Sequence, residues 1–263
     1  MYAIDFHTHV FPDHLASKAV EHLAGAADVE AKGKGTLDDL REKMDEANVK
    51  TSILAAIATR IDQVASINRW LWSNRSERFE PFAAIHPEDP DRRERIHEAA
   101  GTGFKGIKLH PNYQSFYPDE ERILELCRAI ADEGMILLLH SGVDWAFEEN
   151  MAAPQRLVKL MEEVPDLKLV AAHCGGFENW EDVEKYLAGA DVWFDISFTL
   201  PFIEKDQFMR IARKHGTDRL LFGTDYPWAT PGDNLKILNT FDFTEEEKEQ
   251  ILHKNAEELL SSK

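Results

Sequence analysis

Short apolar runs alternate with longer amphipathic stretches along the whole chain. Each run is largely apolar and often β-branched, which is typical of a strand buried on both faces of a parallel sheet. There are eight such runs, at residues 2–6, 51–57, 82–85, 106–109, 135–139, 167–172, 192–196 and 220–222. The pattern therefore predicts eight strands separated by helices.

The stretches between the runs carry helical periodicity and helix-start signals. In residues 119–132 the apolar positions recur at helical spacing, while Glu and Arg fill the other face. Thr36 precedes a second helical pattern as an N-cap residue. Thr244 and Glu247 form a capping box ahead of a third. These signals indicate that the strands are joined by helices rather than by hairpin turns.

The repeat length favours a barrel. Eight strand–helix units in 263 residues leave about 33 residues for each unit, the size of a βαβ repeat. We therefore predict an α/β protein with a single (β/α)8 TIM-barrel domain over residues 1–263. A doubly wound open sheet is the alternative, but it predicts a Gly-rich fingerprint after the first strand, where this chain has HTHVFPDH.

Polar residues follow the predicted strands. The carboxyl ends of barrel strands meet at one mouth, where enzymes of this fold carry their chemistry. The residues at these ends are His7, His9, His86, Lys108, His110, His140, His173 and Asp225. A lone histidine at a strand end is usually structural, which applies to His86 and His110. Several such groups at one rim predict a site.

Side-chain alternation sharpens this prediction. Asp5, His7 and His9 share one face of the first strand, and Ile4, Phe6 and Thr8 share the other. We expect the apolar face to pack under the helices and the polar face to point into the barrel. Burying so many polar groups is costly unless a partner satisfies them. A divalent metal satisfies this need, with His7, His9, His140 and Asp225 as its predicted ligands.

Charge and composition exclude several classes of function. Lys and Arg total 30 and Asp and Glu total 48, a net charge of −18. A surface this negative repels nucleic acids and anionic membranes. No apolar run is long enough to span a bilayer, no signal peptide is visible, and there are only 2 cysteines. We therefore expect a cytoplasmic protein; a homodimer is compatible with the sequence.

Four motifs together resemble the amidohydrolase superfamily. They are DFHTHVFP at 5–12, LLLH at 137–140, VAAHCGG at 170–176 and FGTDYPW at 222–228. The resemblance is greatest to the branch that contains aminocarboxymuconate semialdehyde decarboxylase. It implies that His7 and His9 bind the metal, with His140 as the third ligand. It also implies that Asp225 binds the metal and transfers a proton, and that His173 polarises the substrate or orients water.

The fourth strand leaves two alternatives open. In two-metal relatives a lysine on this strand is carboxylated and bridges the ions, a role that Lys108 would fill. In the decarboxylase branch the site holds one metal, and Lys108 or His110 would instead bind an anionic substrate. The imidazole and carboxylate ligands favour Zn²⁺, with Mn²⁺ or Fe²⁺ as alternatives.

The leading functional hypothesis is a metal-dependent hydrolase that activates water for attack on a small ester, lactone or amide. The alternative is a metal-dependent nonoxidative decarboxylase of an unsaturated or aromatic acid, which would use the same residues. A non-catalytic metal-binding scaffold is a third hypothesis, which the general base at the mouth disfavours. Either reaction predicts a small-molecule substrate, and we expect it to carry a carboxylate. Cys174 adjoins His173, but we interpret it as a packed thiol.

Overall fold

A computed structural model describes residues 1–262 and confirms the predicted (β/α)8 barrel. Each strand pairs in parallel with the next, from β1 to β8. The strands are β1 (Ala3–Thr8), β2 (Val49–Ala55), β3 (Phe79–Ala84), β4 (Gly106–Leu109), β5 (Ile136–Leu139), β6 (Lys168–Ala171), β7 (Trp193–Asp195) and β8 (Leu220–Leu221). The Phe6 amide donates to the Phe222 carbonyl at 2.8 Å, which joins the last strand to the first.

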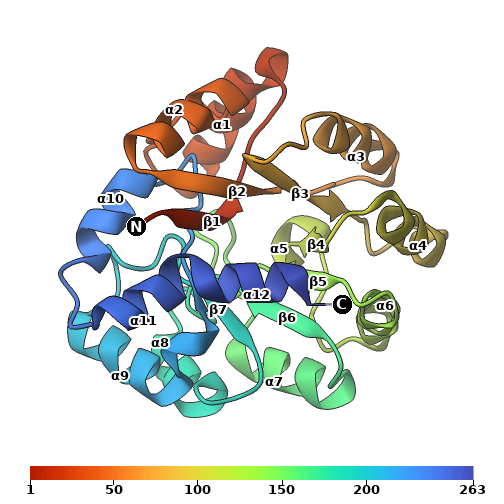
Figure 1. Ribbon diagram of the computed structural model, residues 1–263. Helices are drawn as coiled ribbons and strands as arrows, with labels where there is room; N and C mark the ends of the chain where they lie inside the picture. The colour runs from red at the N-terminus through yellow and green to blue at the C-terminus, as the bar shows by residue number, and fades with distance from the viewer. Residues whose placement is uncertain (263) are drawn as a thin grey trace.

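Helices surround the strands, as the amphipathic stretches predict (Figure 1). The α-helices are α1 (Asp13–Ala27), α2 (Leu37–Glu46), α3 (Val64–Ser73), α4 (Arg92–Thr102), α5 (Pro111–Gln114), α6 (Glu121–Asp132), α7 (Pro154–Glu163), α8 (Trp180–Asp182), α9 (Lys205–His215), α10 (Pro231–Leu238), α11 (Glu245–Glu249) and α12 (Asn255–Ser261). The caps at Thr36 and Thr244 form as predicted. None of the helices in residues 1–262 has the length and apolarity needed to cross a membrane.

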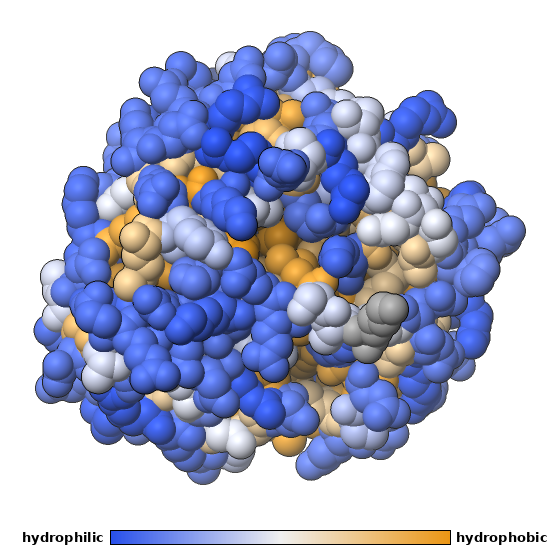
Figure 2. Space-filling model, in the orientation of Figure 1, coloured by the Kyte–Doolittle hydropathy of each residue, from blue (hydrophilic) through white to orange (hydrophobic). Residues whose placement is uncertain are grey.

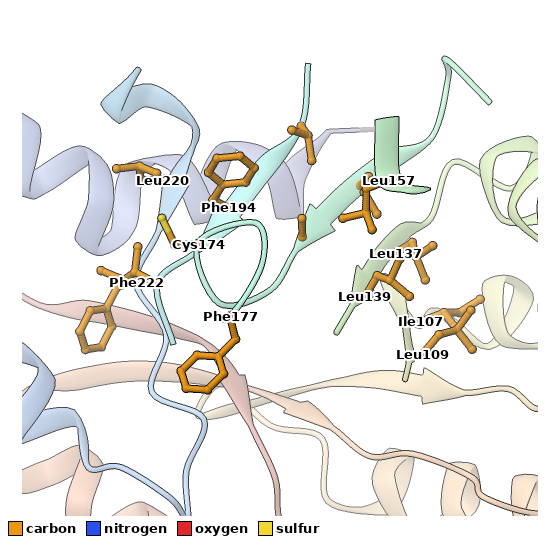
Figure 3. Close-up of a cluster of buried hydrophobic side chains, with 14 of the residues drawn as sticks. Ile107, Leu109, Leu137, Leu139, Leu157, Cys174, Phe177, Phe194, Leu220 and Phe222 are labelled. Carbon is orange, nitrogen blue, oxygen red and sulfur yellow. The ribbon is translucent and has the colours of Figure 1, made fainter. Parts of the chain in front are cut away.

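An outer apolar layer lies between the strands and the surrounding helices. Figure 3 shows part of it, with side chains of β4 beside those of β5. Ile107 of β4 is in register with Leu137 of β5, and both are fully buried. Cys174 belongs to this layer, and burial raises the pKa of its thiol. The structure thus confirms that Cys174 is a packed thiol.

A second apolar cluster fills the interior of the barrel and forms its floor. Side chains from β1, β2, β3, β5, β6 and β8 meet there, together with Ala256 and Leu259 of α12. Strands on opposite sides of a barrel can share one cluster only inside it. Figure 1 shows α11 and α12 crossing in front of the strands, and Figure 2 shows mostly hydrophilic residues on this face. The amino-terminal end of the barrel is therefore closed by the C-terminal helix.

The prediction that Ile4 and Phe6 pack under the outer helices is wrong. Both side chains belong to the interior cluster, where Phe6 meets Phe82 edge to face at 5.7 Å. The cause is an irregularity in β1: Asp5 is paired with Ser52 and Thr8 with Leu54, so three steps on β1 match two on β2. An extra residue of this kind breaks the alternation of side chains. It allows Phe6 to face the floor and His7 to face the mouth.

Candidate metal centre

Backbone hydrogen bonds place the carboxylate after β8 beside the histidine pair of β1. The Asp225 amide donates to the His7 carbonyl at 2.8 Å, and the His9 amide donates to the Tyr226 carbonyl at 2.6 Å. His7 is fully buried, and Asp225 is 7% exposed. The segment after β8 therefore continues the parallel pairing with β1 and delivers its carboxylate to the mouth.

Three side chains converge on one point at this mouth. His7 Nε2 and His9 Nε2 lie 3.2 Å apart. Asp225 Oδ1 is 3.5 Å from the first nitrogen and 3.1 Å from the second. A tetrahedral metal with bonds of about 2.0–2.1 Å holds its ligand atoms about 3.3–3.4 Å apart. The triangle of ligand atoms therefore has the size that one metal ion requires.

The hydrogen bonds on the far side of the two rings identify their tautomers. His7 Nδ1 lies 3.1 Å from Asp195 Oδ2, and His9 Nδ1 lies 2.7 Å from the Ala55 carbonyl. A carbonyl and a carboxylate can only accept, so each Nδ1 carries the proton and each neutral ring has a lone pair on Nε2. Two lone pairs facing a carboxylate repel one another unless a cation lies between them. The residues present therefore fit a divalent metal.

Asp195 and Ser197 contact His7 on the side away from the metal site, although no role was predicted for either residue. Ser197 Oγ lies 3.0 Å from His7 Nδ1 and also donates to Asp195. All three side chains are fully buried. Carboxylates that orient a ligand histidine in this way tune metal affinity. The sequence contained a signal for Asp195, because it is the last residue of β7 and the other site residues also lie at the ends of strands.

His140 and His173 adjoin the triangle. His173 Nδ1 donates to the Ser197 carbonyl at 2.9 Å, so Nε2 is the acceptor atom in the tautomer that this bond selects. His140 Nδ1, 3.1 Å away, must then donate, which leaves a lone pair on His140 Nε2. This nitrogen is buried and has no hydrogen-bond partner among residues 1–262. It is a free ligand atom, although His140 lies outside the group that His7, His9 and Asp225 form.

Lys108 and His110 also reach the mouth, as their positions on one face of β4 predict. Lys108 Nζ lies 3.0 Å from His7 Nε2, and His110 stacks on His140 with ring centres 3.9 Å apart and planes at 13°. His110 Nε2 lies 3.2 Å from Asp144 Oδ2. His110, His140 and Asp144 are close enough to hold an ion. Parallel stacked rings, however, direct their in-plane lone pairs side by side rather than toward one point.

Burial dominates the electrostatics of the mouth. It lowers the pKa of His7 well below its ordinary value, and Lys108 lowers it further. Burial also lowers the pKa of Lys108 to about 8, although Asp195 and Asp225 oppose this. Burial alone would raise the pKa of Asp225, but His7 and His9 hold it below its usual range. Asp225 is thus an ionised carboxylate and His7 a neutral imidazole, which are the states that bind a metal.

Three further strand-end and loop residues, His86, Tyr226 and Tyr113, differ in whether they reach the site. His86 Nδ1 accepts from the Glu88 amide at 3.1 Å, outside the cluster at the mouth. Tyr226 is fully buried beneath the mouth and bonds to Asp39 at 2.6 Å. Tyr113 contacts the His110 ring edge to face at 4.7 Å. Of these aromatic side chains, Tyr113 is therefore the one that borders the site.

The chain is similar in sequence to curated proteins over part of its length. The chain is 24% identical over 154 residues to a dihydroorotase from Vibrio vulnificus (strain YJ016). That match covers 52% of this chain and 44% of the relative, so the chain spans less than half the length of that curated relative.

Two solved structures match the chain almost end to end. A 2,6-dihydroxybenzoate decarboxylase from Rhizobium superposes with a TM-score of 0.73 at 18% identity, over 99% of this chain and 98% of that one. A 5-carboxyvanillate decarboxylase from Novosphingobium aromaticivorans, complexed with manganese and a nitrobenzoic acid, gives 0.74 at 16%, over 98% and 96%. At such identities the likeness establishes the fold. The amidohydrolase family model matches residues 4–261, and the chain therefore belongs to the amidohydrolase family.

Proposed function

We propose that this protein is a metal-dependent decarboxylase of a small carboxylic acid, with an aromatic or unsaturated acid as its substrate. The observation that carries the proposal is the convergence of His7 Nε2, His9 Nε2 and Asp225 Oδ1 within 3.1–3.5 Å of one another. Lys108 adds a cation beside them. A metal and an ammonium group in a buried mouth together suit an anionic substrate.

The metal, when bound, supplies a Lewis acid for the oxygen atoms of the substrate. His7, His9 and Asp225 would hold it, with His140 Nε2 as the further ligand that the family resemblance implies. Asp195 and Ser197 keep His7 Nδ1 protonated, so that its Nε2 stays available. Lys108 would hold the substrate's carboxylate beside the ligands. Because Lys108 donates to His7 Nε2, its ammonium must turn away when that nitrogen binds the metal.

Decarboxylation needs one proton delivered to carbon. The bond between the carboxyl carbon and its neighbour breaks, carbon dioxide leaves, and the electron pair stays on the substrate carbon. Asp225 or His173 would first take up a proton from solvent and then pass it to that carbon, which forms the new C–H bond. A positioned proton donor of this kind contributes about 100- to 10,000-fold to the rate. The proton is restored from solvent, so no further reactant is consumed.

Hydrolysis, the leading hypothesis from the sequence, becomes the second candidate. The matched structures with decarboxylase activity cover nearly the whole chain, whereas the dihydroorotase matches cover about half of it. The same Asp225 carboxylate could serve as the general base for water. The dihydroorotase matches and the amidohydrolase family keep this candidate open.

The test begins with metal content. Protein purified without chelators should contain about one Mn²⁺ or Zn²⁺ per chain, measured by plasma mass spectrometry, and a His7→Ala/His9→Ala double variant should lose it. The loaded protein is then given carboxyl-labelled 2,6-dihydroxybenzoate or a lactone. Release of labelled carbon dioxide supports the proposal, while release of acid from the lactone without gas supports hydrolysis. Protein that binds no metal, even after reloading, would overturn both candidates.

A further inference from the structure

The loop between α1 and α2 contacts the segment that carries Asp225. Its sequence, Gly33-Lys34-Gly35-Thr36, superficially resembles a phosphate-binding loop, but it lacks the required spacing. In the structure the Pro227 carbonyl accepts hydrogen bonds from the Lys32 amide at 2.7 Å and the Gly33 amide at 3.0 Å. The loop is therefore attached to the backbone two residues beyond Asp225.

The side chain of Tyr226 strengthens this attachment. Its hydroxyl donates to Asp39 Oδ2 at 2.6 Å and accepts from the Gly35 amide at 3.1 Å. A Cβ atom on Gly33 would lie 2.2 Å from the Tyr226 ring. Only glycine allows this approach, so the loop fits closely around the tyrosine.

Asp39 is fixed as firmly as the tyrosine that it binds. It lies in the first turn of α2, where the helix dipole favours a carboxylate. Its Oδ2 also accepts from the Lys34 amide at 2.9 Å, and its own amide donates to Thr36 Oγ1. Asp39 is 7% exposed and Tyr226 is fully buried. These contacts fix the side chain of Tyr226 against α2 and the loop before it, while its carbonyl accepts from the His9 amide at the mouth.

Asp225 needs such support because its own backbone is strained. Its φ angle is +64°, in the left-handed region that residues with a side chain rarely adopt. The adjoining Tyr226 amide donates to Thr224 Oγ1 at 3.1 Å, and Thr224 in turn is held by Asp5. A backbone conformation of this kind persists only where the surroundings fix it.

We propose that Asp39 is a positioning residue for the metal centre: it anchors Tyr226, and Tyr226 holds Asp225 at the place where its carboxylate completes the ligand triangle. The inference rests on the metal centre of the proposed function but not on the reaction. The role of the loop at Gly33-Lys34-Gly35-Thr36 is then to hold Tyr226 rather than to bind a phosphate.

The test measures metal affinity rather than turnover. Asp39→Ala and Tyr226→Phe break the same hydrogen bond from its two ends, so each should weaken Mn²⁺ binding about 10- to 100-fold, in competition with a fluorescent chelator. Because both substitutions break one interaction, their effects should not add: the double variant should bind Mn²⁺ no more weakly than the single variant with the lower affinity. Asp39→Asn keeps an acceptor for the tyrosine and should recover most of the affinity.

A matched control separates positioning from general destabilisation. Thr244→Ala removes a helix cap near the floor and should lower stability without changing the Mn²⁺ affinity. If Asp39→Ala and Tyr226→Phe fold but bind Mn²⁺ as the wild type does, or if Thr244→Ala weakens binding equally, the inference is wrong. A wild type that binds Mn²⁺ but releases no carbon dioxide would overturn the proposed decarboxylation and leave this inference intact. A wild type that binds no metal would overturn both.

Discussion

The two ends of the barrel are built on opposite principles. The floor consists of apolar side chains from six strands, closed by Ala256 and Leu259 of α12. The mouth gathers histidines, carboxylates and a lysine at the carboxyl ends of the barrel strands, including β4 and β7, which contribute no buried side chain to the floor cluster. No residue of the apolar floor cluster has a positive φ angle, whereas His173, Phe198 and Asp225 at the mouth do.

This difference separates the source of stability from the source of function. Positive φ at a residue with a side chain costs of order 1–3 kcal/mol, and such strain clusters at functional sites. Burial of the floor residues offsets it, because a fully buried large apolar side chain contributes about 1.5–3 kcal/mol. Substitutions at the mouth should therefore change chemistry and metal binding, whereas substitutions at the floor should change the free energy of unfolding.

The largest effect is expected at the mouth. Asp225→Asn removes the proton-transfer group and the negative charge of the ligand triangle while preserving its shape. We expect the rate of carbon dioxide release to fall about 100- to 10,000-fold, with thermal unfolding still cooperative. The measurement is kcat with the metal content determined in parallel. Activity above one tenth of the wild type would contradict the assignment of Asp225.

A substitution at the floor should lower the stability of the fold and leave metal binding unchanged. Phe82 is fully buried and packs edge to face on Phe6. Phe82→Ala should lower the free energy of unfolding by about 3–5 kcal/mol, because it removes buried area and leaves a cavity. Urea unfolding measures the loss, and the Mn²⁺ affinity of the folded protein should stay unchanged. A large loss of affinity at constant stability would show that the two ends are not separable.

Acid sensitivity should reside in part outside both ends. His215 ends α9, stacks on Phe194 at 3.8 Å and accepts from the Gly189 amide. Burial lowers its pKa to about 4, so between pH 4 and its ordinary value of 6.5 the unfolded state binds more protons than the folded state. The contribution of neutral His215 to the free energy of unfolding is therefore fully present above pH 6.5. It is lost as the pH falls from 6.5 through 4, a decrease of about 3 kcal/mol.

His215→Asn, which keeps an acceptor but does not titrate, should remove this dependence. Urea unfolding at pH 7 and pH 4.5 should show a smaller acid-induced loss of stability in the variant than in the wild type. Equal losses in the two proteins would assign the acid sensitivity to other groups.

Strand-level features could be predicted from the sequence, whereas contacts made by loops could not. Apolar runs mark β4 and β5 because both faces of these strands are buried, and the strand-end rule brings Lys108 and His173 to the mouth. The irregularity in β1 leaves no composition signal, so the direction of Phe6 was predicted wrongly. Asp144 lies in a loop after β5, where no periodicity predicts its contact with His110. The ligand roles of His140 and the other residues remain predictions.

The smallest effect tests the attachment of the floor. Thr244 Oγ1 accepts from the Glu247 amide at 3.2 Å, and Glu247 Oε2 accepts from the Thr244 amide at 2.8 Å. This capping box begins the helical segment that ends in α12, which covers the floor. Thr244→Ala should lower the free energy of unfolding by about 1 kcal/mol, a typical cost of losing an N-cap. Urea unfolding measures this loss, and carbon dioxide release per folded molecule should stay the same. A change in that rate would mean that the packing of the floor affects the geometry of the mouth. Stability and function would then not be separated between the two ends of the barrel.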